Sequence, residues 1–376
     1  MAWRTARVQD QRVEFVVAMS RGESKLSRLC QEFAISRPTG YRWWKRFQKE
    51  GMAGIEERSR CPHHTPGRTS GGIEQRVVEL RRARPDWGAR KLQVLLRREQ
   101  VSLPAGTIHR ILLRHDLVRE PDRHPAAVNR FEREAPNQLW QMDFKGPKGW
   151  NHPVGPLSIL DDHSRYATAL QATGSTREQS VREVLQATFQ ECGLPEQMLM
   201  DHGCPWWSGQ AERGWTRLTV WLMKQDIELY FSGYRHPQTQ GKVERMHRSL
   251  TAALLRRGTP AAEHRQAWLD EFRREYNEVR PHQALGMRTP SQVWCKSLRS
   301  YQPHPPAWVY PAGYETMPVK RQGHIRLHGR RVWVSEALAG ENVGLLEVAG
   351  RVLIFFRRTV VRAVDLPTLA EAEEWA

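Results

Sequence analysis

The spacing of hydrophobic positions changes along this chain of 376 residues, and each change marks a region. Up to residue 118 they recur every three or four residues, which is the spacing of amphipathic helices. Between residues 137 and 300 short apolar runs alternate with helical patterns, as expected for a sheet covered by helices. From residue 323 strand-like runs are separated by glycine turns. We predict a multidomain α+β protein with a helical N-terminal part, a central α/β domain with a mixed sheet and a small C-terminal β-barrel.

The N-terminal part begins with a helix, a short turn and a basic helix, which is the helix-turn-helix plan. Within residues 1–58, Ser36 can cap the basic helix. Tyr41, Trp44 and Phe47 have the spacing of an inward face. A solvated face on an ordinary helical hairpin is the alternative interpretation. We expect the opposite face to contact DNA through Arg37, Thr39, Arg42, Lys45 and Arg46.

Residues 73–118 repeat this plan and predict a second helix-turn-helix domain, so the DNA site is expected to be extended. Two polar, proline-bearing segments, residues 59–72 and 119–136, have no apolar period and are predicted linkers. His63 and His64 lack a second ligand pair at zinc spacing, and we treat them as linker residues.

The central domain is predicted to cover residues 137–300, including a helical extension after residue 258. Its strands are expected in the runs Leu139–Phe144, Leu157–Asp162, Tyr166–Gln171, Met198–Asp201 and Ile227–Phe231. Ser175 and Glu178 have the spacing of a capping box and predict the start of a helix. A further helix is expected over Lys242–Arg257.

The C-terminal region is predicted to be a linker, residues 301–322, followed by a small SH3-like barrel, residues 323–366. The short strands without an intervening helix favour this architecture. Arginine and histidine residues in it are equally compatible with DNA contact and with a solvated surface.

The charge of the chain points to a polyanionic partner. There are 58 Lys and Arg residues against 41 Asp and Glu, a net charge of +17. Chains this basic commonly bind nucleic acid, and double-stranded DNA is the expected partner. No apolar run reaches the length of a membrane span, and no signal segment opens the chain. Five scattered cysteines form no CxxC pair, which fits a reducing cytoplasm.

Three carboxylates carry the candidate chemistry. Asp143 lies in a predicted strand, Asp201 ends another, and Glu244 lies in the first turn of a predicted helix. Phosphoryl transfer on DNA can use two divalent ions about 3.5–4 Å apart, and hard ions such as Mg²⁺ or Mn²⁺ prefer carboxylate oxygens. We therefore expect these three acids to be catalytic and to bind two Mg²⁺ or Mn²⁺ ions per site.

Each acid also has a structural alternative. Glu244 could form a surface ion pair with Arg248, four residues along the helix. Asp201 precedes His-Gly and could simply form a turn. Asp161 and Asp162 stand beside the turn of a predicted hairpin, and that turn alone explains them.

Five ordered segments resemble the integrase-type core of bacterial insertion-sequence transposases: LWQMDFKG, ILDDHSRYA, DHGCPW, HPQTQGKVERMHR and YNEVRPHQALGMRTPSQVW. These are DDE enzymes with a ribonuclease-H-like fold. The resemblance covers residues 137–295, and ISRPTGYRWWKRF and VSEALAGENVG extend it to the helix-turn-helix and the C-terminal barrel. It assigns the metal-binding acids to Asp143, Asp201 and Glu244.

The resemblance also implies that Lys242 and His247 contact DNA or assist catalysis, and Arg248 lies on the same side of the helix, where phosphates would pass. His202 departs from the family pattern, which usually has Asn at that position. The interval from Asp201 to Glu244 is longer than in retroviral integrases, with Ser208–Gly214 as the extra material.

The sequence therefore predicts a transposase that binds element ends, cleaves them and joins 3′ ends to target DNA. Acting on two ends implies a dimer or a larger homo-oligomer, and we expect a cytoplasmic, nucleoid-associated location in a bacterium. A catalytically silent DNA-binding protein or regulator derived from a transposase is the main alternative, and a simple nuclease is another.

Overall fold

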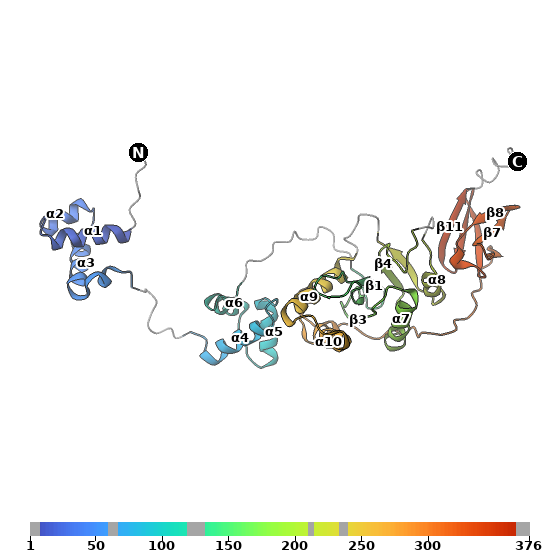
Figure 1. The fold of residues 1–376 in the computed structure, drawn as a ribbon, viewed down its shortest axis with the longest axis horizontal. Coiled ribbons are helices and arrows are strands. Elements are labelled where there is room, and N and C mark those ends of the chain that lie inside the picture. Colours follow the sequence, from blue (N-terminus) through green and yellow to red (C-terminus); the bar gives the residue numbers. More distant parts are fainter. Residues whose placement is uncertain (1–7, 59–66, 119–131, 210–213, 233–239, 366–376) are drawn as a thin grey trace. The chain divides into compact units, whose positions relative to one another are not determined.

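The computed structural model describes residues 8–58, 67–118, 132–209, 214–232 and 240–365. The chain divides into two compact units, Met1–Ser70 and Gly71–Ala376 (Figure 1). His63, His64 and most of both predicted linkers lie outside the described residues, as does most of the loop before Gln240. No helix in the described ranges is long and apolar enough to cross a membrane.

The first unit is a three-helix domain formed by α1 (Val8–Ser20), α2 (Leu26–Glu32) and α3 (Arg37–Glu50). Ser36 caps α3 as predicted, because its side chain accepts a hydrogen bond from the Thr39 amide. The helices cross closely at Gly40, where an added Cβ would lie 2.4 Å from the Cys30 Sγ atom. The absence of a side chain at this position permits the close packing of α3 against α2 and α1.

The inward face of α3 differs from the prediction. Tyr41 is 62% exposed, whereas Trp43 is 8% exposed. Trp44 and Phe47 pack against the core as expected. The true inward stripe starts at Gly40, and the adjacent aromatic residues at positions 41, 43 and 44 allowed two registers. The prediction that Tyr41 faces inward was wrong.

The second unit begins with another three-helix domain, formed by α4 (Gly71–Ala83), α5 (Ala89–Arg98) and α6 (Ala105–Arg114). Trp87 and leucine, isoleucine and valine side chains fill its core. Charged contacts join this domain to the central one: Asp86 pairs with Arg256 and Arg280, and Arg84 pairs with Glu275.

The central domain contains a five-stranded mixed sheet in the order β3-β2-β1-β4-β5. β1 pairs with β2 and β2 with β3 in antiparallel fashion, whereas β1 pairs with β4 and β4 with β5 in parallel. The mixed sheet confirms the predicted fold class of this region. The strands are β1 (Leu139–Phe144), β2 (Leu157–Asp161), β3 (Ala167–Gln171), β4 (Gln197–Met200) and β5 (Glu228–Phe231).

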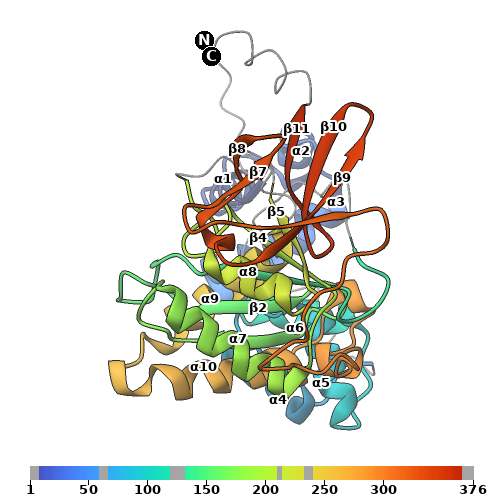
Figure 2. The ribbon, with the colours of Figure 1, turned by 90° about the vertical axis from the view of Figure 1, so that its right-hand side faces the viewer.

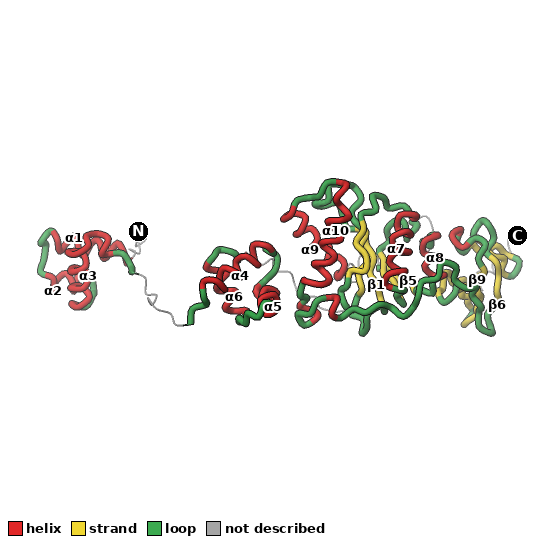
Figure 3. Tube along the Cα trace, turned by 90° about the horizontal axis from the view of Figure 1, so that it is seen from below, coloured by secondary structure: helices red, strands yellow, loops and turns green. Residues whose placement is uncertain are grey.

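Helices cover both faces of this sheet (Figure 3). On one face α7 (Glu178–Cys192) and α8 (Arg217–Lys224) pack against Trp140, Met142 and neighbouring apolar residues. On the other face α9 (Gly241–Arg257) and α10 (Arg265–Arg274) pack against Leu160, Ala167 and Leu170. Alternate residues of β1 therefore point to different helix layers.

The start of α7 shows that the predicted capping box does not form. The helix begins at Glu178 with Arg177 at the N-cap and no side-chain cap. The Ser175 hydroxyl instead accepts a hydrogen bond from the Arg177 amide in a local turn.

The C-terminal strands form a four-stranded antiparallel sheet, β11-β10-β9-β6, and a separate hairpin, β7-β8 (Figure 2). The predicted small barrel is not confirmed, because the strands in the described part of the chain do not close into a ring. β6 lies inside the segment that the sequence predicts as a linker. The strands are β6 (Glu315–Pro318), β7 (His324–Leu327), β8 (Arg330–Trp333), β9 (Asn342–Val348), β10 (Arg351–Phe356) and β11 (Thr359–Asp365).

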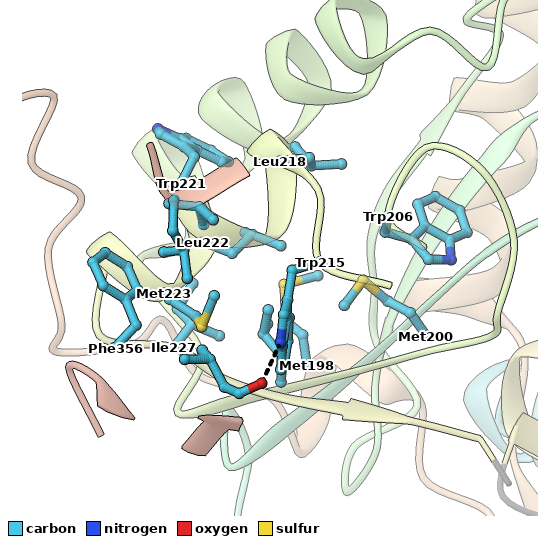
Figure 4. Close-up of a cluster of buried hydrophobic side chains, with 14 of the residues drawn as sticks. Met198, Met200, Trp206, Trp215, Leu218, Trp221, Leu222, Met223, Ile227 and Phe356 are labelled. Carbon is cyan, nitrogen blue, oxygen red and sulfur yellow. Dashed lines mark hydrogen bonds between the residues drawn. The ribbon is translucent and has the colours of Figure 1, made fainter. Parts of the chain in front are cut away.

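The C-terminal strands pack on the central domain beside α8. The Trp215 indole donates a 3.1 Å hydrogen bond to the Val361 carbonyl, and Trp221, Met223 and Phe356 belong to the same apolar cluster (Figure 4). This contact buries the outer face of α8, which explains why that helix is apolar nearly all round.

Candidate active site

The pairing of two parallel strands places the two candidate aspartates at one edge of the central sheet. Asp143 is the penultimate residue of β1, and Asp201 directly follows β4. The register pairs Leu139 with Gln197 and Gln141 with Leu199, so its continuation sets Asp143 level with Asp201. The carboxyl ends of parallel strands are the usual position of functional groups in such sheets.

Both aspartates belong to the α9 side of the sheet. Trp140 and Met142 of β1, and Met198 and Met200 of β4, belong to the apolar cluster on the α7 side. Because strand residues alternate between faces, Asp143 and Asp201 belong to the opposite face. The fold therefore brings together two acids that are 58 residues apart in the sequence.

Glu244 comes to the same face on helix α9. Val243, Met246 and Leu250 of this helix are fully buried against the sheet, and Glu244 beside them is exposed. The alternative ion pair with Arg248 does not form, and Glu244 has no salt-bridge partner within 4.0 Å in the described part of the chain. An unpaired carboxylate at the rim of the sheet is available to a cation.

Asp201 is held by two hydrogen bonds to one of its oxygens. Oδ1 accepts from the Gly203 amide at 2.9 Å and from the Trp206 indole at 2.7 Å. The turn that was the structural alternative for Asp201 is thus present. It orients the carboxylate and leaves Oδ2 without a hydrogen bond from any described residue. Trp206 in turn stacks on Phe144, the residue after Asp143.

His202, which departs from the family pattern, packs against aromatic rings. Its ring lies edge-on to Trp207 at 4.4 Å and near Phe231 at 5.9 Å. Trp207 also contacts Phe231. These rings support the segment that follows Asp201.

Asp143 lies beside a histidine of α9. The His247 Nδ1 atom is 3.7 Å from Asp143 Oδ2, and its Nε2 atom is 2.9 Å from the hydroxyl of Ser158. Ser158 is buried on β2 directly opposite Asp143. Burial, together with the charge of Lys145, lowers the pKa of His247 to about 4, so the imidazole is neutral at pH 7.

The acids influence one another electrostatically. Burial raises the pKa of Asp143 to about 7, and the charges of Asp201 and Glu244 contribute to the increase. Three carboxylates gathered in this way suit a hard divalent cation. Within the described residues, no three acidic, His or Cys side chains are already arranged to hold a metal ion. The fold gathers these acids at one edge, and ligation would require their side chains to turn.

Lys242 makes a buried ion pair. Its ammonium lies 2.5 Å from Asp162 Oδ2, which also accepts from the Arg133 amide at 2.8 Å. The carboxylate of Asp161 accepts hydrogen bonds from the Asn137 and Ser164 amides. Both aspartates are fully buried. Asp161 stabilises the hairpin turn through Ser164, in agreement with the turn interpretation, whereas the Asp162 side chain contacts Arg133, Gln141 and Lys242, which lie outside the turn. DNA contact by Lys242 stays a prediction.

Two further residues, Gln141 and Ser158, were not predicted from the sequence; both are buried polar residues on the Asp143 face of the sheet. A usable signal was present, because both lie at alternating positions within apolar strands, Gln141 two residues before Asp143.

The predicted DNA-contact residues differ in exposure. Arg37, Arg42 and Lys45 are exposed on α3, and Arg248 is exposed on α9. Thr39 and Arg46 are half-buried and contact their own domain, since Arg46 donates to the Glu56 carbonyl. His247 is turned toward Asp143 and Ser158.

Family models match four parts of the chain. Integrase core domains match residues 133–237 and 225–290, so they cover all three candidate acids. A helix-turn-helix domain matches residues 11–63, and a homeodomain-like domain matches residues 39–112.

Three curated proteins are similar over much of their length. An uncharacterised 31.7 kDa protein of insertion element IS407 from Burkholderia multivorans is 26% identical, over 60% of this chain and 81% of its own. A 39.2 kDa protein of insertion element IS476 from Xanthomonas euvesicatoria is 24% identical, over 64% and 70%. The transposase for transposon Tn552 of Staphylococcus aureus is 21% identical, over 62% and 53%.

The pKa of Asp143 predicts a pH-dependent loss of stability in the metal-free protein. The folded value of about 7 exceeds the unfolded value near 3.9, so the folded state binds this proton more tightly. Stability should fall as pH rises from 4 to 7 and stay low above 7. Asp143→Asn should remove this component and stabilise the protein at pH 8 by on the order of 2–4 kcal/mol. Thermal unfolding at both pH values measures it.

The matched control for that experiment is Glu263→Gln, which neutralises an exposed acid. It should leave the pH dependence unchanged. An Asp143→Asn protein that is less stable than the parent at pH 8 would contradict the electrostatic argument.

Proposed function

We propose that this chain, a relative of the DDE-type insertion-sequence transposases with a ribonuclease-H-like integrase core, cleaves the inverted ends of a mobile element and joins the 3′ ends to target DNA. The observation that carries the proposal is the placement of Asp143 and Asp201 on one face and edge of the sheet, with Glu244 on the helix packed against that face. Integrase core models match this region.

The three carboxylates are the groups that would hold two Mg²⁺ or Mn²⁺ ions. Such ions, when bound, activate the attacking oxygen and stabilise the leaving oxygen of a phosphodiester. The charges of Asp201 and Glu244 both raise the pKa of Asp143, so Asp143 is the acid best suited to contact both ions. The Trp206 indole and the Gly203 amide orient Asp201. His247, neutral and between Ser158 and Asp143, supports the latter without adding charge.

The helix-turn-helix domains would bind double-stranded DNA at the element ends. The exposed side chains Arg37, Arg42 and Lys45 extend from one helix, and Tyr41 is exposed on the same helix. A basic helix of this kind enters the major groove, where its N-terminal residues reach base edges. Arg248 is exposed one turn after Glu244 on the same helix, where the cleaved strand would pass. Cutting and joining two ends requires at least two copies of the chain.

Neutralising any one acid should abolish strand transfer while DNA binding persists. The variants are Asp143→Asn, Asp201→Asn and Glu244→Gln, each of which removes a charged ligand and keeps the size of the side chain. We expect at least a hundredfold loss, roughly the contribution of a few kcal/mol to a transition state. The measurement is joining of labelled end DNA to a plasmid in Mg²⁺, beside gel-shift binding of the same DNA.

Glu183→Gln is the control, because this exposed acid of α7 has its carboxylate hydrogen-bonded to Gln179 rather than to the site. It should join ends at the parental rate. Normal joining by any of the three site variants would remove that residue from the proposal. A parent protein that binds ends and never nicks them would instead favour a silent regulator.

The charged face of α3 should control end binding in a salt-dependent way. Lys45→Ala should weaken binding and lower the slope of log K against log salt by about one, because one phosphate contact is lost. Fluorescence anisotropy over a range of salt concentrations measures both. Arg28→Ala on α2, where Arg28 pairs with Glu32, is the control and should leave the slope unchanged. An unchanged slope for Lys45→Ala would exclude the residue from the DNA interface.

A further inference from the structure

The helix that carries Glu244 has no cap of its own. The N-cap residue of α9 is Gln240, and its side chain makes no capping hydrogen bond. The first four amides of any helix need partners from outside the helix. In α9 one of these amides, that of Val243, donates to the side-chain oxygen of Gln141 at 3.3 Å. The cap is therefore supplied by a residue 102 positions away, on strand β1.

Gln141 is itself fixed at its other end. Its side-chain amide donates to Asp162 Oδ1 at 2.9 Å, and Gln141 and Asp162 are both fully buried. Asp162 Oδ2 in turn pairs with Lys242, the residue before Val243. A closed path of polar contacts thus runs from β1 to Asp162 and back to the first turn of α9.

This path joins the two elements that carry the acids. Gln141 is two residues before Asp143 on the same face of β1, and Val243 directly precedes Glu244. One turn further along α9, His247 contacts Ser158 and approaches Asp143. Glu244 therefore lies between two polar attachments of its helix to the β1–β2 hairpin. Apolar contacts alone would hold the helix against the sheet without fixing its rotation and position so closely.

We propose that Gln141 is a positioning residue, which caps α9 from strand β1 and so fixes the position of Glu244 relative to Asp143. The inference rests on the proposed function of these acids as metal ligands. Asp162 and Lys242 complete the attachment. A group that orients a metal ligand from outside commonly changes metal affinity by 10- to 100-fold when it is removed.

The test uses Gln141→Met in the full-length protein, since Met keeps the length of the side chain and removes the hydrogen bonds to Val243 and Asp162. The matched control is Thr168→Val on β3, a buried polar side chain of the same sheet that bonds to the Ile159 carbonyl and not to α9. Three quantities are measured: amide hydrogen exchange of residues 241–244 without metal, Mn²⁺ binding by calorimetry, and the Mn²⁺ concentration for half-maximal end cleavage.

We expect Gln141→Met to speed exchange in the first turn of α9 and to raise both the Mn²⁺ dissociation constant and the half-maximal concentration about tenfold. Saturating Mn²⁺ should restore much of the cleavage rate. Thr168→Val should leave all three unchanged apart from general stability. Faster exchange with unaltered Mn²⁺ binding would overturn the proposal, because the cap would then be structural only.

A second variant covers the case in which Gln141→Met does not fold. Lys242→Met removes the ion pair to Asp162 at a partly exposed position and should raise the Mn²⁺ dissociation constant about threefold; unchanged binding overturns the proposal. Failure of the proposed function looks different. The parent protein would then cleave no end DNA in any metal, while hydrogen exchange would still report whether Gln141 caps α9.

Discussion

The structure depends on the parallel pairing of β1 with β4, because this pairing forces two carboxylates to the same edge of one sheet. Like charges held close together and partly removed from water raise the free energy of the folded chain. The raised pKa of Asp143 reports this cost. Apolar packing stabilises the sheet on both faces and offsets this repulsion between the acids. The packing comes from α7 and α8 on one face and from α9 and α10 on the other. A rigid sheet that keeps acids together against their repulsion is prepared for a cation.

Helix α9 adds the third acid by a different principle. Its apolar stripe packs against the sheet, and its polar contacts with Gln141, Asp162 and Ser158 fix the rotation of the helix about its own axis. Buried polar contacts of this kind contribute little net stability but strongly disfavour alternatives in which they are unmade. The same elements therefore serve the fold and the geometry of the candidate site.

Strands and long helices of the central domain could be predicted because their apolar residues follow clear periods. The run LWQMDF became β1 and the segment after Gly241 became α9. The candidate acids were chosen from their places in a strand, at the end of a strand and in the first turn of a helix. Other predictions were wrong because the local sequence allowed more than one structure. Tyr41 lies among aromatic residues that allowed two helical registers, and Ser175 formed a local turn in place of a cap. The sheet pairing of β6 and the cap from Gln141 depend on contacts between distant residues, which spacing along the chain does not encode.

We propose that Asp143, Asp201 and Glu244 together bind a pair of divalent ions. The most direct measurement is a crystal structure of the protein grown with Mn²⁺, in which anomalous scattering locates each metal ion without reference to the protein atoms. We expect two peaks about 3.5–4 Å apart, with oxygens of all three side chains in contact with at least one of them. Ordered Mn²⁺ bound elsewhere, or bound to the two aspartates with Glu244 still turned to solvent, would contradict it.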